Sequence, residues 1–105
     1  MDQELDQLKR EFLTEAEEKV REMESALDRG RDRTSLERLG YLAHQLKGSG
    51  GSYGYQRIST DAAEIEKAIE SVSDGGLDPR IEAKIKQHVG SLRSEIGNRA
   101  RELGA

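Results

Sequence analysis

The chain has 105 residues, of which 36% are charged and 4% aromatic, and its net charge is −4 with both signs interleaved. This length fits one domain with an aliphatic core, and the lack of cysteine excludes disulfides and thiolate metal sites. The charge balance argues against a nucleic-acid-binding protein, which usually presents a basic face. Because no signal peptide or membrane span is recognisable, we expect a cytoplasmic protein.

The first segment carries apolar residues every three or four positions, which is the period of a helix and not of a strand. They are Leu5, Leu8, Phe12, Ala16, Val20, Met23 and Leu27. Asp2 can cap the start of this helix, and Gly30 can end it in a left-handed turn. A helix of about 25 residues is long for a globular protein. We therefore expect a break near Lys9–Glu11, which would leave a short N-terminal helix before the first helix of a bundle.

A second helix follows a short linker at 31–33. Thr34 and Glu37 have the spacing of a capping box, which predicts that this helix begins at Ser35. Its end is less well defined, because the glycines at 48, 50 and 51 would together cost about 3 kcal/mol of helix propensity. Propensity alone predicts an end near Ser49.

A third stripe comprises Ile58, Ala62, Ile65, Ile69 and Val72, and the polar residues Asp61, Glu64, Glu66, Lys67 and Glu70 fall outside it. The Ser73–Gly76 cluster reads as a turn. Asp78 then caps a last helix that has Pro79 at its first position.

The last stripe comprises Ile81, Ile85, Val89, Leu92, Ile96 and Leu103. Gly90 and Gly97 weaken this helix, and we expect its tail to fray after Asn98. Four amphipathic segments with short connections can bury their stripes only on one another. The sequence therefore predicts an all-α, up-down-up-down antiparallel four-helix bundle that forms a single domain over residues 1–105.

His44 lies on the second helix and faces away from the apolar residues Leu39, Leu42 and Leu46. The face that it shares also carries Glu37, Gly40, Tyr41, Lys47, Gly48 and Gly51. Its neighbours one turn away in each direction, Gly40 and Gly48, lack side chains. Glycine inside a helix is about 1 kcal/mol less favourable than alanine. Its presence on both sides of His44 therefore suggests that larger side chains would interfere with a function of this histidine.

The run His44-x-Leu46-Lys47-Gly48-Ser49, followed by Tyr53-Gly54, resembles the signature of histidine phosphotransfer (HPt) domains of two-component phosphorelays. Gly50 stands where Ala or Ser is more usual, and Tyr53 where Leu, Val or Phe is. The resemblance extends to the layout of the whole chain. It implies that the second helix continues to about Ser52, with Gly50 and Gly51 letting a neighbouring helix approach and Gly54 in the turn.

The resemblance also implies a function. His44 would accept a phosphoryl group from a receiver-domain aspartate or from a kinase, and would pass it to an aspartate of a response regulator. Imidazole is a suitable nucleophile near neutral pH. Lys47 would stabilise the charge of the phosphoryl oxygens, and Gly48 would leave room for the partner. The partner-binding surface would include Tyr41, Gln45, Gly40 and Gly51.

The same resemblance implies a phosphohistidine carrier without ATP-dependent kinase activity. No cofactor of its own is expected. Mg²⁺ is expected on the partner receiver domain, because His44 has no local carboxylate cluster. The partners would be response-regulator receiver domains and a hybrid sensor histidine kinase. We expect a monomer that binds neither nucleic acid nor membrane.

Three other interpretations of the glycine-rich helix differ from this one in their sequence requirements. The glycine-rich run does not fit a nucleotide loop, because Lys47 precedes the glycines and lies on a helix. The dimerisation domain of a histidine kinase would place an acidic residue directly after the histidine, where this chain has Gln45. A four-helix adaptor or scaffold without chemistry remains the alternative function. No motif surrounds His88, which we interpret as a structural or surface residue.

Overall fold

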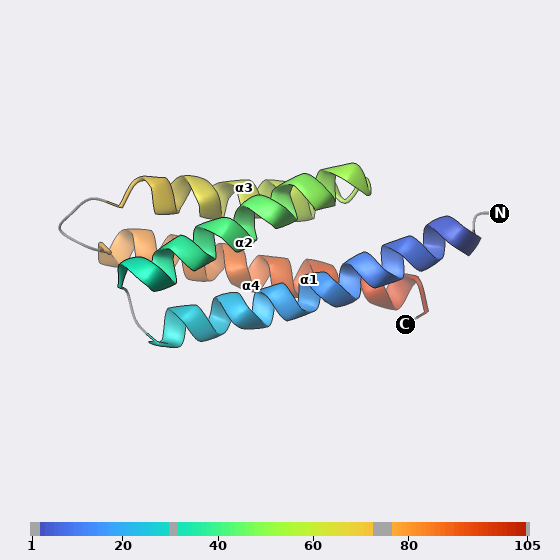
Figure 1. Ribbon diagram of the computed structural model, residues 1–105, viewed down its shortest axis with the longest axis horizontal. Helices are drawn as coiled ribbons and strands as arrows, with labels where there is room; N and C mark the ends of the chain where they lie inside the picture. The colour runs from blue at the N-terminus through green and yellow to red at the C-terminus, as the bar shows by residue number, and fades with distance from the viewer. Residues whose placement is uncertain (1–2, 30–31, 73–76, 105) are drawn as a thin grey trace.

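The computed structural model describes residues 3–29, 32–72 and 77–104, and in these ranges it contains four α-helices and no strand. The helices are α1 (Gln3–Arg29), α2 (Arg33–Ser52), α3 (Gln56–Glu70) and α4 (Pro79–Glu102). Consecutive helices run in opposite directions, and α4 packs back against α1 to close the bundle (Figure 1). This arrangement confirms the predicted up-down-up-down four-helix bundle.

The core is formed by the apolar stripes of all four helices. Its largest fully buried side chains are Leu13, Met23, Leu39, Leu42, Leu46, Ile58, Ile65, Ile85, Leu92 and Ile96. Burying one such side chain stabilises the fold by about 1.5–3 kcal/mol, so packing rather than helix propensity holds the helices together. None of the helices in the described ranges has the length and apolar character needed to cross a membrane.

The first helix is continuous, so the predicted break at Lys9–Glu11 and the separate short N-terminal helix are wrong. α1 runs without interruption for 27 residues. Arg10, inside the expected break, donates hydrogen bonds of 3.2 and 2.8 Å to the carbonyl oxygen of Leu103. These bonds tie α1 to the end of α4. The fourth helix in turn stays helical to Glu102, beyond the expected fraying point at Asn98.

The apolar stripe of α1 is buried only from Phe12 onward. Leu5 and Leu8 are 43% and 47% exposed, because the first turns of α1 extend past the connection between α2 and α3 (Figure 1). The apolar residues of α1 therefore keep their helical spacing beyond the part of the helix that the rest of the bundle covers. The prediction that the whole stripe belongs to the core is wrong for these two leucines.

The second helix begins earlier than predicted, and its cap is Asp32 rather than Thr34. The Asp32 carboxylate accepts a 2.8 Å hydrogen bond from the Ser35 amide, and the helix starts at Arg33. This bond holds the pKa of the Asp32 carboxyl below its ordinary value. At the start of α4, the predicted cap is confirmed, since Asp78 accepts a 2.6 Å bond from the Arg80 amide. The predictions for Asp2, Gly30 and Ser73–Gly76 lie outside the described residues.

The end of α2 follows the family resemblance and not propensity, because the helix continues to Ser52. A Cβ atom at Gly50 would lie 3.0 Å from Ile58 Cγ2 and 3.1 Å from the backbone nitrogen of Ser59. Glycine is thus required where α3 approaches α2 most closely. Gly54 adopts φ +81°, a left-handed conformation that glycine accepts without strain and that turns the chain into α3.

Two glycines in the same helix should respond in opposite ways to alanine substitution. At Gly48 an added Cβ would meet nothing within 4 Å, so Gly48→Ala should raise the free energy of unfolding by up to about 1 kcal/mol. At Gly50 the added methyl would press on α3, and Gly50→Ala should lower that free energy by about 1–3 kcal/mol. Urea denaturation of both variants tests this pair, and changes of the same sign would contradict the packing described.

Candidate functional site

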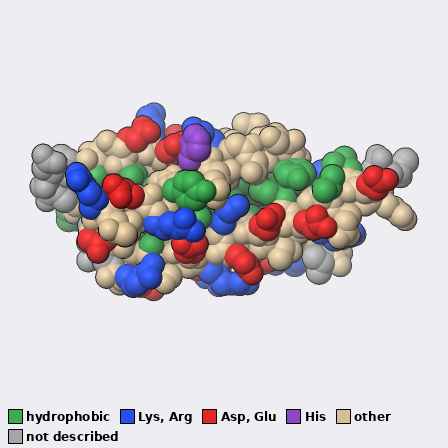
Figure 2. All heavy atoms as spheres, viewed as in Figure 1, with side chains coloured by type: hydrophobic (Ala, Val, Ile, Leu, Met, Phe, Trp, Pro, Cys, Tyr) green, Lys and Arg blue, Asp and Glu red, His purple; other side chains and the backbone are tan. Residues whose placement is uncertain are grey.

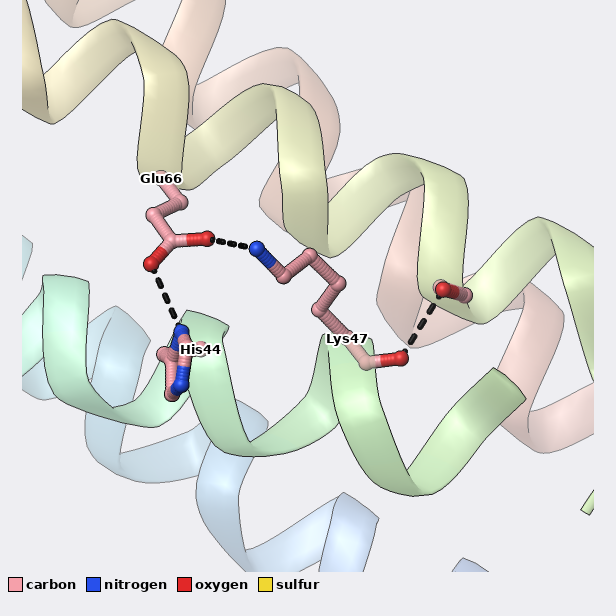
Figure 3. Close-up of polar contacts among 4 residues, drawn as sticks. His44, Lys47 and Glu66 are labelled. Atoms are coloured by element: carbon pink, nitrogen blue, oxygen red, sulfur yellow. Dashed lines mark hydrogen bonds and ion pairs between the residues drawn. The ribbon is translucent and has the colours of Figure 1, made fainter. Parts of the chain in front are cut away.

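His44 projects outward from the middle of α2, as predicted. Its side chain is 66% exposed, whereas the flanking Leu42 and Leu46 are fully buried. Figure 3 shows the imidazole on the side of α2 that borders α3, where it faces Glu66. The helix therefore presents its histidine to solvent while its opposite face is anchored in the core.

Glu66 of α3 is the residue that sequence reasoning missed. One oxygen of its carboxylate lies 2.8 Å from His44 Nδ1, and the other accepts a 2.7 Å hydrogen bond from Lys47 Nζ (Figure 3). The sequence placed Glu66 correctly outside the stripe of α3, but nothing in it indicated which residues of α2 it would face. A site with no carboxylate in its own sequence neighbourhood thus obtains one from the adjacent helix.

The close packing of α2 and α3 makes this contact possible. Ser59 Oγ donates a 2.8 Å hydrogen bond to the carbonyl oxygen of Lys47, and Ser59 lies directly against Gly50. From this point Glu66 follows seven positions later, two turns along the same face of α3. The small residue at Gly50 therefore sets the distance at which Glu66 can reach His44.

The ionised carboxylate of Glu66 decides which nitrogen of the His44 ring carries a proton in their contact. The hydrogen bond from Lys47, with a further one from His44, holds the pKa of the Glu66 carboxyl below its ordinary value of 4.5, although burial opposes this. An ionised carboxylate can only accept hydrogen bonds. His44 Nδ1 must therefore carry the proton in this contact, which leaves the lone pair of the neutral ring on Nε2.

Lys47 lies on the same surface as His44. Its ammonium is bound to the Glu66 carboxylate that also holds His44. Its side chain remains 40% exposed. Lys47 thus lies within the same small cluster as His44.

Three glycines near His44 have different surroundings. Gly48 is exposed, and an added Cβ would find open space. Gly40 and Gly51 instead border α3, where a Cβ would be in ordinary contact with Ile69 Cγ2 at 3.7 Å and with Ser59 Oγ at 3.6 Å, respectively. Only Gly48 therefore leaves a clear approach to the imidazole.

Tyr41 and Gln45 lie beside His44, on the side of α2 that borders α1. Tyr41 is 53% exposed, and its hydroxyl accepts a 2.9 Å hydrogen bond from Gln45 Nε2. Figure 2 shows a histidine standing out from the surface close to hydrophobic side chains, with acidic and basic groups interspersed around them. The surface around the histidine is therefore mixed in character rather than of one charge.

The second histidine has a structural environment. His88 Nδ1 lies 3.0 Å from one carboxylate oxygen of Asp61, whose other oxygen accepts a 2.7 Å bond from Ser91 Oγ. Asp61 is only 8% exposed, so its predicted position outside the α3 stripe is wrong. A buried carboxylate must be compensated by such partners, which gives His88 a role in joining α4 to α3.

Comparisons with known proteins relate the chain to a family and to one relative. A family model described as Hpt domain matches residues 7–95, a range that contains every residue of the site. The chain is also similar to the chemotaxis protein CheA of Rhizobium meliloti (strain 1021), with 26% identity over 95% of this chain and 14% of the relative. The chain thus spans a small part of that relative's length. No solved structure matches the chain significantly.

The lowered pKa of Glu66 predicts a pH-dependent contribution to stability. A carboxyl whose pKa falls on folding stabilises the fold when the pH is above the ordinary pKa of 4.5. This contribution disappears as the pH drops through the lowered pKa of the folded state. Glu66→Gln should therefore melt below the wild type at neutral pH, and the difference should shrink in the acidic range below 4.5. Thermal unfolding followed by circular dichroism measures this, with the exposed Glu37→Gln as the control. A difference that does not change with pH would contradict the ion pairing of Glu66.

Proposed function

The chain belongs to the Hpt domain family, whose members transfer phosphoryl groups in two-component signalling, and on this premise we propose that His44 is its phosphoacceptor. The observation that carries the proposal is the state of the imidazole. Its Nδ1 contacts the Glu66 carboxylate, the side chain as a whole is 66% exposed, and a Cβ added at Gly48, one turn along, would meet nothing within 4 Å. We infer that Nε2 is the nitrogen a partner's reactive group approaches.

The transfer step follows from this arrangement. The lone pair of His44 Nε2 forms a bond to phosphorus while the bond from phosphorus to the partner's aspartyl oxygen breaks, and the partner's carboxylate leaves with the electron pair. The ring becomes cationic, and its Nδ1 proton stays in the hydrogen bond to the Glu66 carboxylate. Because no proton has to leave, the step can run in reverse and deliver the group to another aspartate.

Lys47 and Glu66 supply the electrostatic part of the reaction. Phosphoryl transfer depends mainly on positioning and on stabilising charge. Glu66 stabilises the imidazolium, and Lys47 can turn from Glu66 towards the oxygens of the phosphoryl group once that group is present. Both groups thus favour the phosphorylated ring. Glu66 stabilises the positive charge of the imidazolium, and Lys47 stabilises the negative charge of the phosphoryl group.

The partners that fit this chemistry are receiver domains of response regulators and a sensor kinase. We place the Mg²⁺ ion on the partner, because the described residues offer no group of three or more His, Asp or Glu side chains that could hold a metal. Tyr41 and Gln45 lie beside His44 and belong to the proposed docking surface. Gly40 and Gly51 bound it along α3. A monomeric, cytoplasmic carrier remains our expectation.

Loss of the phosphoacceptor tests the proposal most simply. Wild type and His44→Gln are incubated with a Mg²⁺-loaded, phosphorylated receiver domain, and phosphorylation is read from intact mass. We expect His44→Gln to accept nothing while it keeps its helical circular dichroism signal. His88→Gln, the control, should accept normally although it loses the bond to Asp61 and some stability. Acid-labile phosphate on the His44 variant would refute the assignment, and an inert wild type would favour an adaptor.

Replacement of Lys47 should affect the reaction more than the fold. A cation beside developing phosphate charge at a solvated site contributes about 1–2 kcal/mol, so Lys47→Ala should slow transfer roughly tenfold. Its stability should fall by no more than about 1 kcal/mol, the usual value of an exposed salt bridge. The exposed Lys67→Ala on α3 is the matched control. Equal transfer rates for the two variants would show that Lys47 has no part in the reaction.

Larger side chains at position 48 should hinder the approach of a partner to His44 without destabilising the fold. Because a Cβ at Gly48 meets nothing within 4 Å, Gly48→Gln should leave the melting temperature unchanged or raise it. Because helical side chains project towards the preceding turn, the glutamine would occupy the space next to His44. Transfer from a receiver domain should therefore fall further for Gly48→Gln than for Gly48→Ala. A Gly48→Gln variant that transfers at the wild-type rate would show that this space is not the partner's approach.

A further inference from the structure

An exposed aromatic side chain stands one helical turn before His44. Tyr41 is one of three large hydrophobic residues that are exposed in the described part of the chain. The other two, Leu5 and Leu8, lie in the first turns of α1, beyond the connection between α2 and α3. Tyr41 is therefore the exposed hydrophobic residue that shares the neighbourhood of the reactive histidine.

The ring of Tyr41 is fixed by its neighbours although it is exposed. Arg38 Cζ lies 5.3 Å from the ring centroid, over one face of the ring. The hydroxyl of Tyr41 is held by the 2.9 Å bond from Gln45 Nε2. The ring is thus contacted at one face and at its tip, while the residue as a whole remains 53% exposed for contact with a partner.

Arg38 is itself anchored to a different helix. Its Nε and Nη2 atoms donate to the two carboxylate oxygens of Glu22 on α1, the second at 3.1 Å. This pairing lowers the pKa of the Glu22 carboxyl and raises that of the Arg38 guanidinium. Both groups therefore stay charged over the range in which the protein would be assayed, and their pairing holds the guanidinium beside the ring.

Resting on the function proposed above, we propose that Glu22, Arg38, Tyr41 and Gln45 form a preorganised docking platform for the receiver domain, in which Arg38 is the positioning residue for Tyr41. A partner would place an apolar side chain on the exposed part of the ring. Ordering a side chain at an interface costs conformational entropy, and a ring that is already ordered avoids that cost. Aromatic anchors of this kind dominate the energetics of many interfaces.

Geometry indicates which partner covers the platform. Tyr41 precedes His44 by three residues, so the two side chains lie about one turn apart on the same surface of α2. A protein partner in a specific complex covers about 800 Å² on each side, which corresponds to a patch roughly 30 Å across. Any receiver domain whose active site reaches His44 Nε2 must therefore cover Tyr41 as well.

A double-mutant cycle tests whether Arg38 acts through Tyr41. Steady-state transfer from a phosphorylated receiver domain is measured for Tyr41→Ala, Arg38→Met and the double variant, with phosphoramidate as a small-molecule donor that reports the intrinsic reactivity of His44. We expect KM for the receiver to rise roughly tenfold for Tyr41→Ala and two- to fivefold for Arg38→Met. For each variant, the maximal rate of transfer from the receiver and the rate of phosphorylation by phosphoramidate are measured as references for the change in KM. In the Tyr41→Ala background, Arg38→Met should add nothing.

Arg93→Met is the matched control, because Arg93 forms a comparable pair with Glu24 between α4 and α1, at 2.9 and 3.1 Å. It should not change KM. An Arg38→Met effect that persists in full without Tyr41, or no effect of either substitution on KM, would overturn the proposal while leaving the His44 assignment intact. Sedimentation equilibrium gives a third outcome. A wild-type dimer that Tyr41→Ala dissociates would assign the platform to a second copy of the chain and would also overturn the proposal.

Discussion

The carboxylate of Glu66 is the interaction on which the proposed chemistry depends. It contacts both His44 and Lys47, and it reaches them from a different helix. Its position requires α2 and α3 to lie close together, and this is achieved by the absence of a side chain at Gly50 and by the bond from Ser59 to the α2 backbone. Packing of the bundle and protonation of the imidazole are therefore parts of one arrangement.

The second helix, α2, has to combine two properties that a simple amphipathic helix does not combine. It must bury Leu39, Leu42 and Leu46, and it must also present a reactive side chain with free space around it. Its glycines resolve the conflict in different ways, since Gly50 admits α3 and Gly48 leaves the imidazole uncovered. Each lowers the intrinsic helix propensity, and burial of the leucines compensates for that loss.

Helical periodicity was sufficient to predict the bundle and the outward direction of His44, because both depend on residues three and four positions apart. It could not predict contacts between helices. The approach of Glu66 to His44, the burial of Asp61 against His88 and the anchoring of Arg38 by Glu22 all depend on the rotation and register of neighbouring helices. A stripe pattern leaves those quantities undetermined to within about a turn.

The sequence also predicted the ends of the helices less well than their existence. Asp32 and Thr34 are both good capping residues, and in the structure it is the Asp32 carboxylate that accepts the bond from the Ser35 amide. Where a break in α1 was expected, Arg10 instead contacts Leu103, a residue from the opposite end of the chain. The long end of α2 was anticipated only through resemblance to a family, since propensity predicted an earlier stop.

The central claim is that Glu66 holds the proton of His44 on Nδ1 and leaves Nε2 as the nucleophile. The most direct test is a long-range proton–nitrogen correlation spectrum of the histidine rings at about pH 8, where an unperturbed imidazole is neutral, recorded before and after phosphorylation by phosphoramidate. The account predicts that His44 carries its proton on Nδ1 and then acquires phosphorus on Nε2. A His44 ring protonated on Nε2, or phosphorus on Nδ1, would contradict it.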